Sequence, residues 1–485
     1  MDYAAQLSIV LPEVILSVGG LALLMVAAWG GQAVSRAVSW VAVLVLIGAG
    51  IALCNPGVTA DTTAFDKLYR ADLFGAYAKV LIFFAAAISI IIAPRFFART
   101  SGEDLRPEYP ILILFATAGM GMMVSANDLL TLYVGLELNS LASYVLASFM
   151  RRDVRSAESG LKYFILGSLA SGILLYGISL VYGFSGTTIF GDIASAYAGA
   201  EGSAKIGLLF GLVFMFAGLA FKMSAVPFHM WTPDVYEGAP TPVTTFFASA
   251  PKVAAVALAV RVAIEAMGPV TSDWRQIVVF AALASIVLGA VAAINQTNIK
   301  RLLAYSSINN IGFALIGLAA GTAEGVAGVL TYLTIYIVMT LGSFLVVLQM
   351  RDADGQPVES IASLSGLSRT RPALAAALAI FMFSLAGIPP LFGFWAKFAV
   401  FEAAVKAGLF PLAAIGIAAS VIGAYYYLKI VKTMYFDAPA PEYSRETNPV
   451  EGGLIAAAAL FVSPLGYLLI PVLGAWSLAA ARTLF

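Results

Sequence analysis

The sequence predicts an all-α polytopic membrane protein with about fourteen transmembrane helices, two inverted five-helix repeats and two broken helices. Three observations support this fold class. First, 61% of the 485 residues are hydrophobic and 11% are charged, with a mean hydropathy of +0.93, whereas a soluble domain carries about 25% charged residues. Second, apolar segments of about 17 to 25 residues recur, and each can cross a hydrocarbon core of about 30 Å. Third, two of these segments contain proline and lysine near their middle.

The apolar segments give the helices in order. The first segment begins well before Arg36, which is the first basic residue, so it does not match a signal peptide and we expect it to remain as a span. Small residues spaced four apart, such as Gly167 and Ser171, favour close helix contact in lipid. The predicted helices centre near residues 18, 46, 83, 117, 139, 171, 215, 253, 284, 311, 337, 387, 422 and 464.

Two pairs of similar runs indicate an internal repeat. Val-Pro-Phe-His-Met-Trp at 226–231 is similar to Ile-Pro-Pro-Leu-Phe-Gly-Phe-Trp at 388–395, and Ser-Ala-Glu at 156–158 to Thr-Ala-Glu at 322–324. The offsets, from 226 to 388 and from 158 to 324, are 162 and 166 residues. Because each unit has five helices, an odd number, consecutive copies must enter the membrane from opposite sides. The predicted units are an N-terminal three-helix segment at 1–107, a first repeat at 108–266 (helices 4 to 8), a second repeat at 267–440 (helices 9 to 13) and a C-terminal helix 14 at 441–485.

Prolines are expected to break helices 7 and 12. Pro227, and the pair Pro389 and Pro390, lie within bilayer-length apolar segments. A proline there removes a backbone donor and clashes with the preceding turn. Non-helical backbone at that depth is tolerated only inside protein or beside a water-filled cavity. The two breaks therefore indicate where a functional site lies.

Basic residues predict the orientation. Of the 27 Lys and Arg residues, fifteen lie on the odd-numbered loops and their flanks and seven on the even side. The positive-inside rule then places the odd loops in the cytoplasm and both termini on the outer, periplasmic side of a bacterial cytoplasmic membrane. The five that remain within spans are all lysines, which lose their proton on desolvation more readily than arginines do. They are Lys79, Lys162, Lys222, Lys252 and Lys397.

Composition excludes several classes of protein. The formal net charge is zero, which gives no reason to expect binding to nucleic acid. A single cysteine, Cys54, and a single histidine exclude an intrachain disulfide framework and thiolate or imidazole metal clusters. We therefore expect no cofactor in this chain.

Four intramembrane charges are the main candidates for moving protons. Ionisable groups inside a membrane are costly, and in pumps and transporters they form proton relays. The alternative for each is a structural partner that pairs with another helix. They are Glu137 near the middle of the fifth span, Lys222 just before the first break, Lys252 midway along the eighth span and Lys397 after the second break.

The other candidates have plainer alternatives. Lys162 lies one turn into the sixth span, where it can relay protons, snorkel, or pair with Glu158 four residues earlier. His229 has an unperturbed pKa near neutral and can relay protons, or it can pack as an ordinary buried histidine. For Lys79 and Glu13, which lie nearer their helix ends, a structural role is favoured.

Two long motifs resemble a known family. Val226-Pro-Phe-His-Met-Trp-Thr-Pro-Asp-Val-Tyr-Glu-Gly-Ala-Pro-Thr-Pro-Val243 and Asn298-Ile-Lys-Arg-Leu-Leu-Ala-Tyr-Ser-Ser-Ile308 closely resemble the signatures of the antiporter-like membrane subunits of respiratory complex I. The resemblance is strong over helices 4 to 13. Three features favour one of the three antiporter-like members: no long C-terminal lateral helix, Lys397 where another member has Glu, and the Tyr-Glu-Gly-Ala-Pro form of the first motif.

This resemblance implies roles and partners. Glu137 matches the glutamate that pairs with Lys222, while Lys252 matches the central connecting lysine and Lys397 the terminal one. Energy would come from NADH oxidation by quinone in other subunits, which hold FMN and iron–sulfur clusters. The implied partners are a neighbouring antiporter-like subunit, small membrane subunits and the lipid bilayer. Asn310 departs from the pattern, since many relatives carry His there, so a proton branch through that position does not carry over.

Two alternatives remain open from the sequence. An Mrp-type cation/proton antiporter subunit would exchange sodium without NADH, beside genes for antiporter subunits. A scaffold would use its lysines only to neutralise glutamates, so that removing a charge would affect stability and not proton transfer.

Overall fold

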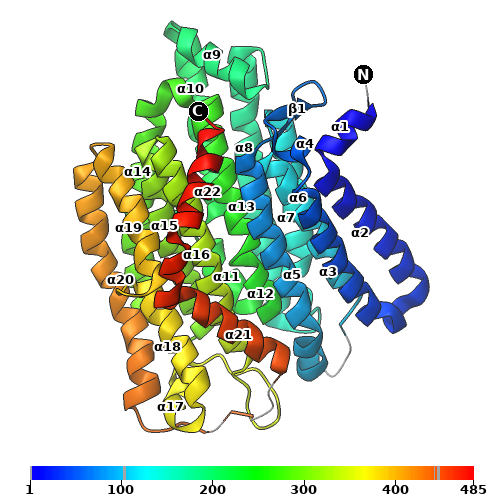
Figure 1. Ribbon diagram of the computed structural model, residues 1–485, viewed down its shortest axis with the longest axis vertical. Coiled ribbons are helices and arrows are strands. Elements are labelled where there is room, and N and C mark those ends of the chain that lie inside the picture. Colours follow the sequence, from blue (N-terminus) through cyan, green and yellow to red (C-terminus); the bar gives the residue numbers. More distant parts are fainter. Residues whose placement is uncertain (1–2, 102–104, 442, 445–447) are drawn as a thin grey trace.

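The computed structural model describes residues 3–101, 105–441, 443–444 and 448–485 as a bundle of helices. Most helices run along the long axis of the molecule, and both chain ends lie at the same end of the bundle (Figure 1). The predicted all-α polytopic fold class is confirmed. A short strand pair is the one departure from it among the residues that the structure describes.

The N-terminal segment contains three long helices and a hairpin that the hydropathy pattern does not predict. Antiparallel strands β1 and β2 pair Thr62 with Ala71 at the end of the molecule that holds the termini. Arg70 of β2 donates to the carbonyl oxygen of Thr483 and lies against Glu265, so the hairpin joins distant parts of the chain. The elements are α1 (Tyr3–Ile9), α2 (Leu11–Gly30), α3 (Ser35–Ala52), α4 (Pro56–Thr59), β1 (Thr62–Ala64), β2 (Tyr69–Ala71) and α5 (Leu73–Ser101).

Two successive groups of helices occupy the places of the predicted repeats. The first consists of α6 (Glu108–Val124), α7 (Leu129–Ala147), α8 (Val154–Ser185), α9 (Phe190–Gly199), α10 (Gly202–Met223), α11 (Trp231–Gly238), α12 (Thr241–Phe247) and α13 (Ala250–Arg261). The second consists of α14 (Thr271–Ile294), α15 (Ile299–Ala320), α16 (Ala323–Leu348), α17 (Leu367–Thr370), α18 (Pro372–Ala386), α19 (Phe392–Lys406) and α20 (Phe410–Phe436). The chain ends with α21 (Pro449–Val462) and α22 (Ile470–Arg482).

In the part of the chain that the structure describes, the helices match the fourteen predicted membrane crossings. Eleven stretches are long and apolar enough to span a membrane, and one of them, Leu11–Ala52, holds both α2 and α3. The shorter apolar helices α6 and α18 supply the other two crossings, and α21 belongs to the last one. Each crossing falls on one of the predicted centres.

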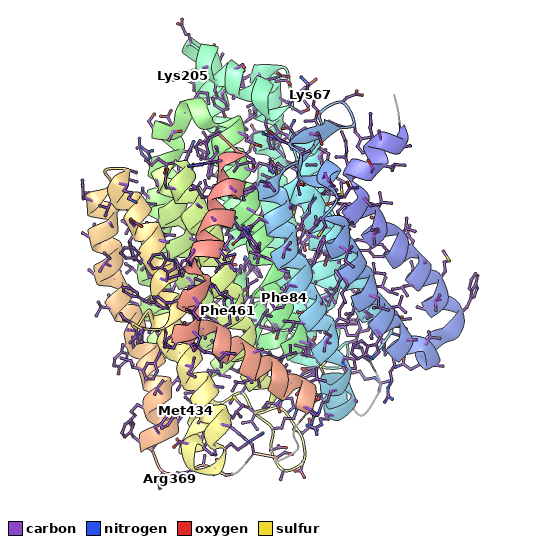
Figure 2. All side chains as sticks on the ribbon, viewed as in Figure 1. Lys67, Phe84, Lys205, Arg369, Met434 and Phe461 are labelled. Atoms are coloured by element: carbon purple, nitrogen blue, oxygen red, sulfur yellow. The ribbon has the colours of Figure 1, made fainter. Side chains whose placement is uncertain are left out.

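The two five-helix groups start from opposite ends of the bundle. Lys67 and Lys205 lie at the end with the termini, and Arg369 lies at the other end (Figure 2). The α6–α7 turn reaches the first end, because Asn127 donates to the carbonyl oxygen of Lys67 at 2.7 Å. The α14–α15 turn lies near Arg369, beside the segment that leads to α17. This antiparallel entry fits inverted repeats, while the boundaries drawn from the sequence stay a prediction.

Both predicted helix breaks are present, and two more appear. Helix 7 is interrupted between α10 and α11 and helix 12 between α18 and α19. Helix 8 is also broken, between α12 and α13 at Ser249, whose hydroxyl donates to the carbonyl oxygen of Thr245. Pro251 follows at the start of α13, where a proline is well tolerated. A further break separates α21 from α22 near Pro464.

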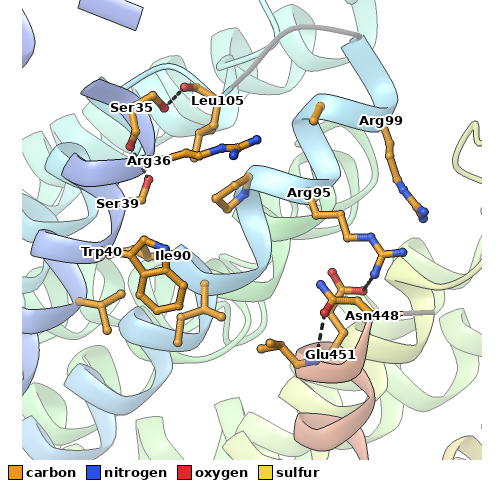
Figure 3. Close-up of a pocket in the computed structure, with 15 residues that line it drawn as sticks. Ser35, Arg36, Ser39, Trp40, Ile90, Arg95, Arg99, Leu105, Asn448 and Glu451 are labelled. Atoms are coloured by element: carbon orange, nitrogen blue, oxygen red, sulfur yellow. Dashed lines mark hydrogen bonds and ion pairs between the residues drawn. The ribbon is translucent and has the colours of Figure 1, made fainter. Parts of the chain in front are cut away.

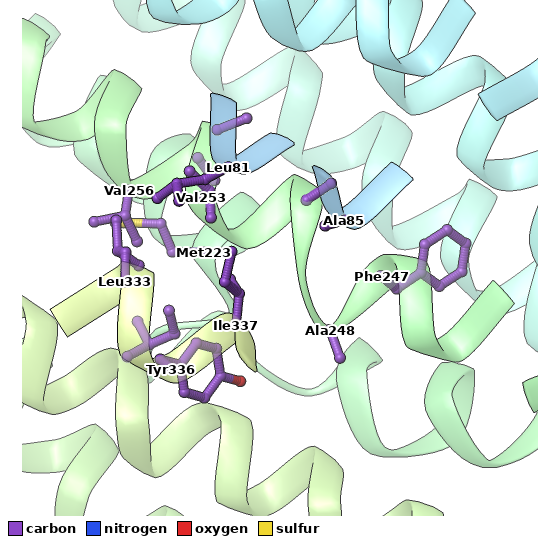
Figure 4. Packing of buried hydrophobic residues seen from close by; sticks show 14 of the residues in the cluster. Leu81, Ala85, Met223, Phe247, Ala248, Val253, Val256, Leu333, Tyr336 and Ile337 are labelled. Carbon is purple, nitrogen blue, oxygen red and sulfur yellow. The ribbon is translucent and has the colours of Figure 1, made fainter. Parts of the chain in front are cut away.

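The breaks of helices 7 and 8 lie in the apolar core. Met223 at the end of α10, Phe247 and Ala248 at the end of α12, and Leu81 of α5 belong to one buried cluster, with α16 beside them (Figure 4). Any charge placed here is kept away from bulk water.

Candidate functional site

Lys222 stands at the end of the first half of helix 7. The half-helix α10 ends one residue later, where Ser224 takes a left-handed conformation with φ of +65°. The Lys222 ammonium donates to the hydroxyl of Ser140 on α7 at 2.7 Å and lies 5.8 Å from the ring centre of Tyr144. The break thus places a buried amine against α7.

Glu137 lies one turn before Ser140 on the same face of α7. Asp128 caps the start of this helix by accepting from the backbone N–H groups of Leu130 and Thr131. The Glu137 carboxyl is half-buried, and its Oε1 atom is buried without a hydrogen-bond partner among the described residues. It acts electrostatically on Lys222, but the two groups make no ion pair within 4 Å among the described residues, and Lys222 bonds to Ser140 instead.

Lys252 lies in the first turn of α13, directly after the break in helix 8. It lies midway along the eighth span, Thr241–Ala266, as the sequence predicted, but the break between α12 and α13 was not predicted. Its ammonium donates to the carbonyl oxygen of Met223 at 3.0 Å and to the hydroxyl of Ser224. Lys252 is therefore bonded to the end of α10, one residue from Lys222.

Lys397 occupies the matching place at the second break. It lies on α19 and donates to the carbonyl oxygen of Ala386, the last residue of α18, at 3.0 Å. It also donates to the hydroxyl of Ser420 at 3.0 Å and lies 4.4 Å from the ring centre of Phe313. At both breaks a buried lysine binds a carbonyl near the end of the first half-helix, where the helix dipole favours a cation. The lysine is Lys252 of helix 8 at the end of α10 and Lys397 of helix 12 itself at the end of α18.

A chain of hydroxyl and amide groups lies between Lys252 and Lys397. On its Lys252 side, Tyr336 donates to Ser307 at 2.9 Å; on the Lys397 side, Tyr332 donates to the Oδ1 atom of Asn310 at 2.6 Å. The rings of Tyr332 and Tyr336 stack with centres 6.4 Å apart. Sequence reasoning named Asn310 only as a departure from the family pattern and did not predict a role for Tyr332, Tyr336 or Ser307, although polar residues at 306–310 inside an apolar span were a visible signal.

Asn310 is fully bonded in this chain. Its Nδ2 atom donates to the carbonyl oxygen of Ser306 at 2.7 Å and to the hydroxyl of Tyr427 at 3.1 Å, while its Oδ1 accepts from Tyr332. An amide does not titrate, so it orients hydroxyl groups here and carries no charge.

A polar cavity of about 580 Å³ lies between the end of α11, the α14–α15 turn and the loop after α16. Lys300, counted from sequence as a loop charge, is buried here and donates to the carbonyl oxygens of Glu237 and Ala239 at the end of α11. It also pairs with Glu359 at 3.0 Å. This cavity reaches the end of the second half of helix 7 at Glu237 and Gly238.

The remaining candidates lie outside this core. Lys162 is 41% exposed and pairs with Glu158 at 2.7 Å and with Asp234 at 2.8 Å, as the ion-pair alternative predicts. His229 lies in the helix 7 break, half-buried, and its Nδ1 atom has no partner among the described residues. Relay roles for Lys162, Glu158 and His229 stay predictions.

Lys79 and Glu13 are partners of each other. Their charged groups are 2.7 Å apart between α5 and α2, and the hydroxyl of Tyr69 donates to the same carboxylate at 2.8 Å. This closed, buried pair supports the structural role that the sequence favoured.

Fold and charges together define a class. A polytopic bundle with half-helices meeting at buried lysines is the architecture of membrane proteins that move cations or protons. Within the described residues, no group of three or more His, Cys, Asp or Glu side chains is arranged to hold a metal ion.

Comparison with known proteins narrows this class. Residues 126–423 match the family model described as NADH:quinone oxidoreductase/Mrp antiporter, TM, and the chain belongs to this family. It is 68% identical, over the full length of both chains, to NADH-quinone oxidoreductase subunit N of Rhizorhabdus wittichii.

Solved structures agree with this family. A chain of respiratory complex I from Thermus thermophilus is similar with a TM-score of 0.81 and 32% identity, over 95% of this chain and 99% of that one. A chain of the Mrp complex from Dietzia has a TM-score of 0.84 at 22% identity, over 99% of this chain and 98% of that one, and shares the fold.

Proposed function

We propose that Glu137, Lys222, Lys252 and Lys397 carry protons across the membrane in this chain. The chain is a proton-translocating membrane subunit of NADH-quinone oxidoreductase, complex I, with other membrane subunits of that complex as its partners. The observation that carries the proposed path is the position of Lys252, which is bonded to the end of the half-helix that presents Lys222.

Glu137 and Lys222 form the switch. Burial disfavours a charged lysine, whereas a nearby carboxylate favours it, so the proton affinity of such a lysine depends on the charge and distance of its partner. Ser140 holds Lys222 near Glu137 without a direct ion pair. A small movement of α7 against α10 therefore changes the interaction strongly.

Protons then pass from Lys222 to Lys252 and onward to Lys397. The hydroxyl groups of Tyr336, Ser307 and Tyr332 lie between the last two lysines, and ordered water would complete the line. At the far end, the ring of Phe313 contacts both Tyr332 and Lys397.

The energy comes from outside this chain. Moving one charge against a membrane potential costs about 2.3 kcal/mol per 100 mV. FMN, iron–sulfur clusters and quinone would act in other subunits, and this chain would hold no cofactor. Charge changes in a neighbouring membrane subunit would reach Glu137 first.

We place the Arg369 end of the bundle in the cytoplasm and both termini on the outer side of the bacterial cytoplasmic membrane. This orientation rests on the excess of basic residues on the odd-numbered loops, fifteen against seven.

The experiment compares NADH-driven proton pumping in membrane vesicles from the wild type and from Lys397→Ala, with native gels to measure assembly of the complex. Pumping and coupled quinone reduction should fall while assembly holds. Lys406→Ala is the matched control, because Lys406 lies on the same helix but is 63% exposed and pairs with Glu402. It should pump normally.

Other outcomes assign other functions. Unchanged pumping with altered sodium-driven exchange would favour an antiporter. Loss of assembly without a change in pumping per assembled complex would favour a scaffold.

A further inference from the structure

Helix 14, which lies outside both predicted repeats, is broken beside the break of helix 12. Its two halves, α21 and α22, are joined by a short 3₁₀ turn at Pro464–Leu469. The hydroxyl of Tyr467 in this turn donates to the carbonyl oxygen of Leu391 at 3.2 Å. Leu391 directly precedes α19, the half-helix that carries Lys397. One hydrogen bond therefore joins the two breaks.

Aromatic packing strengthens this contact. The ring of Phe392, the first residue of α19, lies 5.5 Å from that of Phe461 and 5.8 Å from that of Tyr467, measured between ring centres. Gly466 is buried against the same ring, because a Cβ atom there would lie 2.5 Å from the Cδ1 atom of Phe392. The start of α19 is thus held on one side by the turn of helix 14.

Both halves of helix 14 are anchored to other helices. At the start of α21, Glu451 is buried and lies 3.6 Å from Arg95 of α5 (Figure 3). Glu451 also accepts from the side-chain amide of Gln349. On α22, the hydroxyl of Ser477 accepts from that of Thr331 on α16 at 3.0 Å. The turn between these anchors can therefore hold α19 in place.

The break of helix 7 is closed by a hydrogen bond of its own. Trp231, the first residue of α11, donates through its indole N–H to the carbonyl oxygen of Phe221 on α10 at 2.9 Å. Trp395 ends the similar run of helix 12, but its indole donates to no group among the described residues, and its ring centre lies 6.5 Å from that of Tyr467. Helix 12 thus receives from helix 14 a bond that helix 7 makes within itself.

The position of α19 determines the position of Lys397. Lys397 lies about 7.5 Å along this helix from Phe392. The two halves of helix 12 also meet closely, since a Cβ atom at Gly393 would lie 2.0 Å from the carbonyl oxygen of Ser384. A shift of α19 against α18 would therefore change the 3.0 Å distance between the Lys397 ammonium and the carbonyl oxygen of Ala386. Such interactions depend strongly on distance where water is excluded.

We propose that Tyr467 is a positioning residue for proton transfer through Lys397. Its hydroxyl fixes the start of α19 and thereby the place of the lysine ammonium relative to α18. This inference rests on the proposed function, because it requires Lys397 to carry protons. Helix 14 then takes part in proton transfer without itself carrying a proton.

The test measures NADH-driven proton pumping per assembled complex in Tyr467→Phe, which keeps the ring and removes only the hydroxyl. Pumping should fall by about fivefold, as expected from the loss of one neutral hydrogen bond, while assembly on native gels holds. Tyr425→Phe is the matched control, because Tyr425 on α20 is 57% exposed. It should pump like the wild type.

A second variant pushes the start of α19 instead of releasing it. Gly466→Ala places a methyl group against Phe392 and should also lower pumping per complex. Gly474→Ala on α22 is its control, since a Cβ atom at Gly474 would meet nothing within 4 Å. If Gly466→Ala does not assemble, Tyr467→Phe decides alone.

Combination with Lys397→Ala separates positioning from a purely structural role. The pumping that remains in Lys397→Ala should not fall further when Tyr467→Phe is added, because the group that Tyr467 positions is then absent. Normal pumping per complex in Tyr467→Phe, or a further loss in the Lys397→Ala background, would overturn the positioning role alone. Normal pumping in Lys397→Ala would contradict the proposed function, and the positioning role with it.

Discussion

Two glutamate–lysine pairs within the described membrane spans, Glu13 with Lys79 and Glu137 with Lys222, differ in one respect. In the first pair, Glu13 and Lys79 are 2.7 Å apart and share Tyr69 as a third partner. In the second pair, Glu137 and Lys222 form no ion pair among the described residues; Lys222 donates to the Ser140 hydroxyl, and the Oε1 atom of Glu137 has no partner there. The same residue types therefore occur in a closed and an open arrangement.

This difference separates structural charges from transferable ones. A closed ion pair with a third hydrogen bond holds both charges in place, and losing a proton would leave a buried charge without its partner. An open pair keeps a carboxylate oxygen available and lets the interaction vary with small movements. Burial alone does not identify a proton relay; the number of bonds that each charge has already formed does.

The largest expected effect comes from replacing the lysine of each pair, Lys222 or Lys79, with alanine. Lys222→Ala should abolish NADH-driven pumping while the complex assembles, because the proton carrier is lost and only a bond to Ser140 goes with it. Lys79→Ala should lower the amount of assembled complex and leave pumping per complex near normal. Dye-quenching assays normalised to native gels measure both. A normally assembled Lys79→Ala complex that does not pump would place the closed pair in the relay.

The next effect concerns stability. Glu13→Gln leaves the Lys79 ammonium buried without its carboxylate, and breaking a buried pair costs about 3–5 kcal/mol. Thermal unfolding of the purified complex should therefore start at a clearly lower temperature. Glu158→Gln is the control, because its pair with Lys162 is about half exposed and such pairs contribute about 0–1 kcal/mol. Equal melting of the two variants would contradict the distinction between closed and exposed pairs.

A smaller effect is expected from the Ser140 hydroxyl, which accepts from Lys222. Ser140→Ala removes the bond that positions Lys222, and pumping should fall by about tenfold, which corresponds to about 1.4 kcal/mol. Ser143→Ala, one turn further along α7, removes only a 3.4 Å contact with Asn139 and should pump normally. If both variants pump like the wild type, Glu137 and Lys222 must interact directly when the Ser140 hydroxyl is absent.

The smallest effect is a pH dependence in the loop after α16. Burial alone would raise the pKa of Glu359, but the charge and hydrogen bonds of Lys300 and Asn298 outweigh burial and hold this pKa below its usual value of 4.5. The pair therefore stabilises the fold fully above about pH 4.5, and this contribution is lost as the pH falls through the lower, folded-state pKa.

Melting temperatures measured from pH 6 down to pH 4 and below should show this slope in the wild type. The Glu359→Gln variant should have a lower melting temperature than the wild type at pH 6, and its melting temperature should lack the part of the pH dependence that comes from Glu359. The control Asp354→Asn changes an exposed carboxylate of the same loop and should keep the pH dependence of the wild type. A Glu359→Gln profile parallel to the wild type would show that the Lys300 pair does not contribute.

Hydropathy predicted the spans and prolines predicted two of the breaks, because both act within one segment of chain. The break at Ser249 was not predicted, although Pro251 lies two residues later at the start of α13, because the flanking residues are apolar and continue the hydropathy pattern of one span. The partner of each charge was harder to predict, since apolar length does not tell which face of a helix meets which neighbour. Lys79 and Glu13 are 66 positions apart, and Lys300 reaches α11 only through tertiary packing.

The hydrogen bonds of Lys252 and Lys397 also show how many N–H protons of each lysine are engaged. A lysine ammonium carries three N–H donors, and a neutral amine carries two. Each of these lysines has two acceptors in the described structure, a half-helix carbonyl and a serine hydroxyl. One N–H proton of each lysine is therefore not used in these hydrogen bonds, so both helix ends stay bonded when that proton leaves. The scaffold at the breaks is the same before and after each transfer, and only the charge changes.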